Sequence, residues 1–389
     1  MARRETKGGG LASVMRTMEE QRIAKLRAKL PHWADAQVHI PSQLSLEQCS
    51  SEAAALYKAS LAEQLTKGEG SIADLTGGLG VDSWALSRCC GSLLYFEKNP
   101  ELCTAARANF EALGCSNISC FNQESTLQSI EELPEQSLIF IDPARRSASG
   151  SKVFLLEDCT PDVLTLLPAM CRKAPWILIK LSPMADITMA VNRLQQAAAE
   201  GFGVQQVHIV GAAGEVKELL VLLGLGGGAW SLRLADTDSG ARLDLAPEDE
   251  ARSVLTLANC LNAGTVLLEP RPLLLKAGCF KLPCTLAGLR KLSQDCHLYT
   301  GQMPDGHPLA LFFKQYEIIE TLPTGNASIK ELGRKYPVAE VSAKALHISS
   351  EQLRARIGCK SGIAPDGRHY HIFGCGTAIG GRLIVCFRK

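Results

Sequence analysis

Between Ser71 and Leu225, short apolar runs alternate with segments of helical spacing at a regular interval. The apolar runs read SIADLT, SLLYFE, NISCFN, SLIFID, WILIKL, VQQVHIV and VKELLVLLGL. This alternation is typical of strand–helix–strand units, and it predicts an α/β domain with a largely parallel, doubly wound sheet. Only residues 211–215 separate the last two runs, which is too short for a helical crossover. We therefore expect these two strands to form an antiparallel hairpin at the end of the domain.

The segments on either side of this pattern differ from it. Residues 11–30 have the spacing of a helix with one basic face, and this helix should end at Pro31. The pattern of residues 45–65 predicts one or two amphipathic helices. Residues 229–264 look polar and irregular, and small α+β modules are predicted beyond them, joined by a linker at 323–326. The predicted organisation is a helical region (1–66), the strand–helix core (67–228), a linker with a first small module (229–318), and a basic second module (319–389).

Length and composition exclude several classes of protein. A chain of 389 residues with 46% hydrophobic and 21% charged residues is long enough and apolar enough to fold into more than one domain. Its 15 cysteines include no C-x-x-C pair, and the residues after Met1 lack the apolar block of a secretory signal. The densest apolar run, residues 218–230, is too short and glycine-rich to cross a bilayer. We expect a cytoplasmic protein without a membrane segment; the sequence does not indicate its oligomeric state.

The charges are distributed unevenly along the chain. The net charge is +1, but residues 1–30 carry +5 and residues 330–389 carry +7, so the segment between them carries −11. Two basic ends favour a polyanionic partner such as RNA. The alternative is that both ends are ordinary solvated surfaces.

The strongest chemical signal is the sequence DLTGGLGVD, from Asp74 to Asp82, which leaves a predicted strand and opens a predicted helix. Glycines at 77, 78 and 80 allow backbone N–H groups to approach a ligand closely. The following helix N-terminus offers partial positive charge to an anion. Glu97 ends the next strand, where it could accept hydrogen bonds from two ribose hydroxyls.

Two adenosine cofactors fit this plan. A dinucleotide fingerprint requires G-x-G-x-x-G, but Gly80 is followed by Val81, Asp82 and Ser83, so the third glycine is missing. S-adenosylmethionine (SAM) is therefore favoured. The turn would bind its methionine carboxylate, and Asp74 would bind the neighbouring ammonium group.

These motifs together resemble a class I SAM-dependent methyltransferase. The resemblance is carried by DLTGGLGVD, the acid in YFEKN, IDPARR after the fourth strand, and the closing hairpin. The segments LSLEQCSSEAAALYK, KLSPMADI and LLEPRPLLLKAGCFKL resemble a bacterial group that joins this core to a ferredoxin-like module and a C-terminal THUMP-like domain. The resemblance extends from about Gln43 to the end. It implies a Rossmann-like sheet of strand order 3-2-1-4-5-7-6 with the last strand antiparallel, SAM as methyl donor, and an RNA substrate, because THUMP domains accompany RNA-modifying enzymes.

The resemblance also implies roles for particular residues. The methionine-side turn would consist of Asp74, Gly77, Gly78, Gly80 and Asp82. Glu97 would bind the ribose, and Lys98 would lie over the adenine edge. Glu124 is the candidate for the adenine amino group, although the stretch around it could equally cap a helix.

The target-side motif is Asp142-Pro143-Ala144-Arg145-Arg146, at the carboxyl edge where such sheets bind ligands. Amino-methylating enzymes carry D/N-P-P-aromatic here, with the aromatic ring stacked on the target base. Ala144 and Arg145 replace the second proline and the ring, which puts methylation of an exocyclic amine in doubt. Arg145 and Arg146 could stack on a base, bind phosphate, or form surface ion pairs.

The DPAR string also resembles the DPPR motif of RNA uracil-5-methyltransferases, which use a cysteine after the fifth strand. Here the chain reads Lys180-Leu181-Ser182-Pro183-Met184, without a cysteine, so methylation of carbon-5 is disfavoured. A nitrogen or oxygen acceptor is left, with Asp142 as hydrogen-bond acceptor or base. Lys180 would be its electrostatic partner, or simply salt-bridged to it.

The sequence thus predicts a SAM-dependent methyltransferase that modifies RNA, either rRNA or tRNA. The alternatives are a methyltransferase of a small molecule or protein, and a non-catalytic SAM-binding RNA adaptor. No metal is expected, because His369 and His371 share a strand face with no third ligand at a suitable spacing. The helix that holds Ser50, Ser51, Glu52 and Lys58 could cover the cofactor, but a plain amphipathic helix is favoured.

Overall fold

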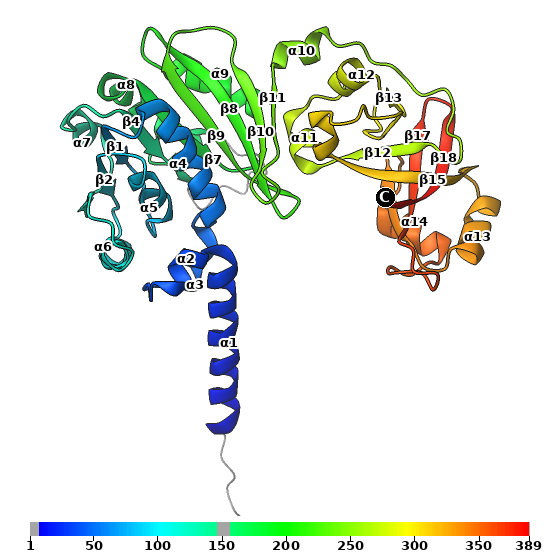
Figure 1. The fold of residues 1–389 in the computed structure, drawn as a ribbon, viewed down its shortest axis with the longest axis horizontal. Coiled ribbons are helices and arrows are strands. Elements are labelled where there is room, and N and C mark those ends of the chain that lie inside the picture. The colour runs from blue at the N-terminus through cyan, green and yellow to red at the C-terminus, as the bar shows by residue number, and fades with distance from the viewer. Residues whose placement is uncertain (1–7, 146–155, 389) are drawn as a thin grey trace, which may run out of the picture. The chain divides into compact units, whose positions relative to one another are not determined.

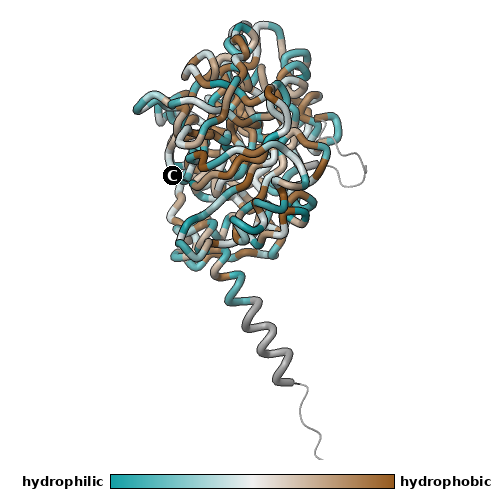
Figure 2. Tube along the Cα trace, turned by 90° about the vertical axis from the view of Figure 1, so that its right-hand side faces the viewer, coloured by the Kyte–Doolittle hydropathy of each residue, from teal (hydrophilic) through white to brown (hydrophobic). Residues whose placement is uncertain are grey.

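The computed structural model describes residues 8–145 and 156–388, and it describes side chains for 19–144 and 156–388. Its contacts separate two units, Met1–Val210 with Lys217–Trp230, and Gly211–Val216 with Ser231–Lys389. Figure 1 shows the helices and strands of each unit. Hydrophilic residues gather at the outer turns in Figure 2, and apolar residues predominate along the interior segments.

The first sheet has the order β11-β10-β8-β9-β7-β4-β1-β2-β3. Its strands are β1 (Ser71–Asp74), β2 (Ser92–Phe96), β3 (Ile118–Phe121), β4 (Leu138–Ile141), β7 (Trp176–Leu181), β8 (Phe202–Ala212), β9 (Glu215–Leu225), β10 (Ser231–Asp236) and β11 (Arg242–Leu245). β1 is parallel to β2 and β4, β4 is parallel to β7, and β9 runs antiparallel to β7. Counted along the core strands alone, this is the predicted order 3-2-1-4-5-7-6, which is confirmed.

A two-residue turn joins β8 to β9. Ala213 and Gly214 both have positive φ angles, 53° and 74°. Positive φ at both central residues is the conformation that matches the twist of two antiparallel strands. The predicted hairpin is therefore present.

The prediction that residues 229–264 are irregular is wrong. They contain β10 and β11, which pair with each other antiparallel, and the helix α10 (Pro247–Arg252). In β10 and β11 apolar residues alternate with polar ones, so that Leu232, Leu234, Leu243 and Leu245 are buried. The alternation was not recognised in the sequence because the two strands are short and the segment as a whole is polar.

In the described part of the first unit, nine helices precede or connect the core strands. They are α1 (Gly8–Lys29), α2 (Pro31–Asp35), α3 (Gln43–Gln48), α4 (Glu52–Thr66), α5 (Val81–Ser87), α6 (Pro100–Ala112), α7 (Leu127–Glu131), α8 (Val163–Lys173) and α9 (Ile187–Ala197). Side chains of Ser51, Asn99 and Asp186 accept hydrogen bonds from first-turn amides of α4, α6 and α9 and so fix where these helices begin. Two short strands, β5 (Ala144–Arg145) and β6 (Cys159–Thr160), pair antiparallel, and a 3-10 turn at Leu156–Asp158 precedes β6.

The second unit contains a seven-stranded sheet of order β13-β14-β12-β15-β18-β17-β16. Its strands are β12 (Val266–Pro270), β13 (Arg290–Lys291), β14 (Tyr299–Thr300), β15 (Phe313–Pro323), β16 (Glu340–Lys344), β17 (Tyr370–Thr377) and β18 (Gly380–Arg388). Its helices are α11 (Pro272–Ala277), α12 (Leu282–Ala287), α13 (Asn326–Lys335) and α14 (Ser350–Ile357), with a 3-10 helix at Pro308–Phe312. The boundary predicted at 318/319 falls inside β15, so strands from both predicted C-terminal modules share one sheet.

Within the described residues, no helix combines the length and the apolar character that crossing a membrane requires.

Candidate functional site

A cavity of about 980 Å³ opens at the carboxyl ends of the parallel strands in the first unit. Its walls come from the loop after β1, the residues that follow β2 and β4, and the end of β7. Part of the N-terminal segment between residues 41 and 50, which includes α3, also lines it. The carboxyl edge of a parallel sheet is where such folds bind ligands.

The glycine turn between β1 and α5 forms one wall of this cavity. Gly78 and Gly80 have left-handed φ angles of 56° and 92°, which favour glycine. A Cβ on Gly77 would lie 2.0 Å from the Tyr95 ring, and one on Gly80 would lie 2.6 Å from the Phe110 ring. Gly78 has no such neighbour, since a Cβ there would meet only one backbone oxygen, 3.8 Å away. Gly77 and Gly80 thus permit close packing, and Gly78 keeps the turn open.

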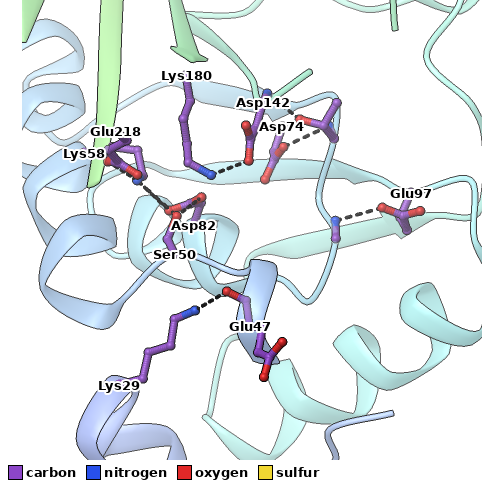
Figure 3. A network of polar contacts seen from close by, with 12 residues as sticks. Lys29, Glu47, Ser50, Lys58, Asp74, Asp82, Glu97, Asp142, Lys180 and Glu218 are labelled. Carbon is purple, nitrogen blue, oxygen red and sulfur yellow. Dashed lines mark hydrogen bonds and ion pairs between the residues drawn. The ribbon is translucent and has the colours of Figure 1, made fainter. Parts of the chain in front are cut away.

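Glu97, directly after β2, is held against the glycine turn. The Gly78 N–H donates a hydrogen bond to its Oε2 at 2.8 Å (Figure 3), and the Asn99 N–H donates to its Oε1 at 2.7 Å. Two backbone amides therefore fix the carboxylate in one orientation at the cavity wall. Each oxygen retains a further lone pair that could accept a hydroxyl hydrogen bond.

Lys98 and Glu124 also line the cavity, and they form an exposed ion pair with 3.2 Å between Nζ and Oε1. The helix-capping alternative for residues 122–125 is wrong by one residue, because the residue that follows them caps α7. The N-cap of α7 is Thr126, whose hydroxyl accepts a hydrogen bond from the Ser129 N–H at 3.2 Å. The role of Glu124 toward an adenine amino group stays a prediction.

Asp74, the last residue of β1, is fully buried beneath the turn. Its carboxylate accepts hydrogen bonds from the Thr76 N–H at 3.0 Å and the Ser83 hydroxyl at 2.5 Å. Burial raises the pKa of Asp74 to about 7, although these two hydrogen bonds act in the opposite direction. Because the pKa of this carboxyl group is near neutral pH, a cation bound next to it at the cavity wall would favour its ionised form.

Asp142, directly after β4, forms an ion pair with Lys180 of β7 (Figure 3). The Asp142 backbone N–H donates to the Thr76 hydroxyl at 2.6 Å, which ties the target-side motif to the glycine turn. Burial alone would lower the pKa of Lys180, but the nearby carboxylates of Asp142, Asp82 and Glu218 outweigh it and raise that pKa. The salt-bridged interpretation of Lys180 therefore matches the geometry.

Pro143 and Ala144 of the same motif line the cavity. Arg145 belongs to β5, but its side chain lies outside the described residues, as does the whole of Arg146. Their predicted contacts with a base or phosphate stay predictions.

The carboxylate of Asp82, in the first turn of α5, accepts a hydrogen bond at one oxygen, and its other oxygen forms an ion pair without a hydrogen bond. The Ser50 hydroxyl donates to its Oδ2 at 2.8 Å, and the Lys58 Nζ lies 3.1 Å from its Oδ1. Burial would raise the pKa of Asp82, but Lys58 and Lys180 outweigh it and hold that pKa below its ordinary value. Asp82 lines the cavity as an anion held by Lys58 of α4 and by Ser50, two residues before that helix begins.

The interpretation of α4 as a plain amphipathic helix missed Lys58. This side chain is fully buried, and its ammonium donates to Glu218 Oε1 at 2.6 Å and to the Ser50 hydroxyl at 3.2 Å. Burial raises the pKa of Glu218, although Lys58 acts in the opposite direction. One signal was available in the sequence, because Glu218 lies in an otherwise apolar strand and a buried carboxylate requires a partner.

Among the residues that the structure describes, no group of three or more His, Cys, Asp or Glu side chains has an arrangement suited to a metal ion. His371 instead shares a 2.9 Å hydrogen bond with the Ser342 hydroxyl, and burial lowers its pKa to about 4.

The chain is similar in sequence or in structure to several known proteins. Residues 267–307 match a family described as a ferredoxin-like domain, and no curated protein matches the sequence. The structure is similar to that of a protein described as a candidate methyltransferase from Porphyromonas gingivalis W83. The TM-score is 0.79 at 29% identity, over 95% of this chain and 88% of that one.

Two further solved structures match part of the chain. One is a candidate RNA methyltransferase from Pyrococcus horikoshii, with 15% identity and a TM-score of 0.37 over 54% of this chain and 99% of that one. The other is a candidate methyltransferase from Streptococcus mutans in complex with SAH, with 14% identity and a TM-score of 0.34 over 43% of this chain and 96% of that one. Neither carries an argument about function. The fold of the first unit is the Rossmann-like fold of class I methyltransferases, and a ferredoxin-like segment follows it. A THUMP-like identity for the C-terminal residues stays a prediction.

Proposed function

We propose that this protein is a SAM-dependent methyltransferase. The observation that carries the proposal is that one cavity brings together the glycine turn, the amide-held Glu97 and the Asp142–Lys180 pair. The similarity to the Porphyromonas gingivalis structure over nearly the whole chain supports it. In a fold that hosts many activities, this site rather than the fold alone is the argument for function.

The residues at the cavity wall fit SAM. When bound, SAM supplies a methyl group activated by its positively charged sulfur. Gly78 leaves space for a ligand at the turn, Glu97 presents fixed acceptors for ribose hydroxyls, and Asp74 offers a carboxylate to an ammonium group. The wall carries more carboxylates than lysines, which suits a cationic ligand.

On the acceptor side, Asp142 would bind and orient the group to be methylated. Lys180 occupies its Oδ2, so Oδ1 could accept a hydrogen bond from an amino or hydroxyl group. This contact would point the acceptor lone pair at the methyl group. The proton that the acceptor loses would pass to Asp142 or to water.

We further propose a nitrogen or oxygen acceptor rather than a carbon that needs a cysteine adduct. Cys49 is a cysteine that the sequence analysis did not consider at this site, and it lines the cavity. Burial raises the pKa of its thiol, and the thiol donates a hydrogen bond to the Leu46 carbonyl at 3.3 Å. A thiol that keeps its proton and donates it to a backbone carbonyl is a poor nucleophile, because the thiolate is the reactive form.

For the substrate class, we propose RNA, bound in the cytoplasm by the basic ends of the chain. The second unit presents exposed cations at Lys330 and Arg334 on α13, at Arg356 on α14, and at Lys360 and Arg368. Such cations contribute salt-dependent affinity for phosphates. A small-molecule or protein substrate, and a SAM-binding adaptor without turnover, are the alternatives that the experiments must separate.

Calorimetry tests the cofactor. Heat with SAM and SAH and none with a nicotinamide dinucleotide is expected, and the reverse result would refute the proposal. Methyl transfer is then measured with radiolabelled SAM and total RNA from cells that lack the protein. Label in RNA is expected with the wild-type chain and not with Asp142→Ala.

The RNA-binding role is tested by charge reversal rather than truncation, because removal of residues 319–389 would cut β15 and remove β16, β17 and β18. In filter binding at two salt concentrations, Lys330→Glu/Arg334→Glu should weaken RNA binding and reduce its salt dependence. Label found only in protein or small molecules would favour the second alternative. SAM binding without any transfer would favour the adaptor.

A further inference from the structure

Lys58 lies outside the strand–helix core but contacts three residues of the cavity wall. It belongs to α4, has no exposed surface, and does not itself line the cavity. Its ammonium contacts Glu218 and Ser50, and it forms an ion pair with Asp82 (Figure 3). A buried ammonium persists only when it is paired, so this arrangement is strongly determined.

The second lysine of the network, Lys180, faces more carboxylates than it can neutralise. It is bonded to Asp142, and its charge also interacts with Asp82 and Glu218. The two lysines therefore share three carboxylates. Lys58 contacts two of these carboxylates, which leaves the Lys180 ammonium on the third.

The three carboxylates do not depend on a cation to the same extent. The side chain of Asp142 is 36% exposed, whereas those of Asp82 and Glu218 are 11% and 4% exposed. Water can solvate Asp142 when it has no partner, but it reaches the other two poorly. An unpaired Asp82 or Glu218 would therefore attract Lys180 away from Asp142.

We propose that Lys58 is a positioning residue for methyl transfer: by neutralising Glu218 and Asp82, it keeps the Lys180 ammonium on Asp142. The inference rests on the proposed function, because Asp142 is the group that would orient the acceptor. It gives the N-terminal helical segment a part in the reaction chemistry beyond covering the cavity.

The test is a crystal structure of Lys58→Met together with its methyl-transfer rate. The Lys180 ammonium should leave Asp142 and lie within hydrogen-bond distance of Glu218 or Asp82. The transfer rate at saturating SAM should fall at least about tenfold, with SAM affinity by calorimetry within about threefold of wild type. A structure in which Lys180 stays on Asp142 would overturn the proposal, because a lysine with a merely packing role would leave Lys180 in place.

Two companion variants keep the test decisive if Lys58→Met does not fold. Lys58→Met/Glu218→Gln carries one buried charge fewer than Lys58→Met. In this variant the Lys180 ammonium should move to Asp82. If it stays on Asp142, the proposal is again overturned. In Lys58→Met/Asp82→Asn/Glu218→Gln no carboxylate competes, so Lys180 should return to Asp142, and its absence there would count against the charge-balance argument. If the wild-type chain transfers no methyl group, the proposed function fails, while the position of Lys180 still decides this inference.

Discussion

The two walls of the cavity are built in different ways. The wall that we propose for the cofactor, called the cofactor wall, consists of the glycine turn and Glu97, whose carboxylate is held by the backbone amides of Gly78 and Asn99. The wall that we propose for the methyl acceptor, called the acceptor wall, consists of Asp142 and Lys180, supported by the buried ion pairs of Lys58. The first wall spans 24 residues of sequence, from Asp74 to Glu97, whereas Lys58 and Glu218 are 160 positions apart.

This difference affects how each wall responds to substitution. A backbone amide stays in place whatever side chain its residue carries, so changes on the cofactor wall should act locally and mainly on affinity. A buried charge affects every other charge in the network, so changes on the acceptor wall should act at a distance and mainly on rate.

The largest effect is expected for Asp142→Asn, which keeps the shape of the side chain but removes its charge. The transfer rate should fall by about 10²–10⁴, because the acceptor loses the group that orients it and accepts its proton. SAM affinity by calorimetry should stay within a few-fold. Glu135→Gln, an exposed carboxylate just before β4, is the matched control and should change neither quantity. An equal loss of SAM affinity and rate in Asp142→Asn would contradict the separation of the two walls.

Asp74, the last residue of β1, should make stability depend on pH. Its pKa is about 7 in the folded protein against an ordinary value of 3.8, so between these values the folded state binds a proton that the unfolded state does not. The free energy of unfolding should therefore fall as pH rises from about 4 to 7. Asp74→Asn removes this dependence, and between pH 4 and pH 8 it should gain on the order of 4 kcal/mol relative to wild type. Urea unfolding at several pH values measures the difference, and parallel curves for the two proteins would show that Asp74 titrates normally.

The cofactor wall could be predicted from the sequence because its signals are local. The alternation of apolar runs indicated the parallel strand–helix units, and the resemblance to class I methyltransferases implied their order in the sheet. The spacing from Gly77 to Glu97 indicated which carboxylate ends the next strand. The single sheet shared by both C-terminal segments could not be seen, because pairing of β15 with β18 joins residues far apart in sequence. Lys58 was named only in a helix that could cover the cofactor, and its buried ion pairs were not predicted, because nothing near it in the chain shows that Glu218 is its partner.

Glu97→Ala should act on affinity rather than on rate. Loss of a charged acceptor of ribose hydroxyls corresponds to about 1.5–3 kcal/mol, or a roughly 10- to 100-fold weaker affinity for SAM. The transfer rate at saturating SAM should change little, because Asp142 and Lys180 are untouched. Glu97→Gln keeps one acceptor oxygen and should lie between Ala and wild type in calorimetry. A rate that stays low when SAM is saturating would place Glu97 in the chemistry instead of in binding.

The smallest effects are expected at the glycines, where packing and ligand access can be separated. Gly77→Ala places a Cβ against the ring of Tyr95, which is buried and donates a 2.5 Å hydrogen bond to the Gly78 carbonyl. The ring must move, so the free energy of unfolding should fall by about 1–3 kcal/mol. Gly78→Ala meets open space and has only its positive φ to accommodate, so we expect a loss of about 1 kcal/mol together with weaker SAM binding. Chemical denaturation and calorimetry on both variants distinguish the two roles. If the two variants have equal free energies of unfolding, the Tyr95 ring can move at little cost. Gly77, like Gly78, would then serve ligand access rather than packing.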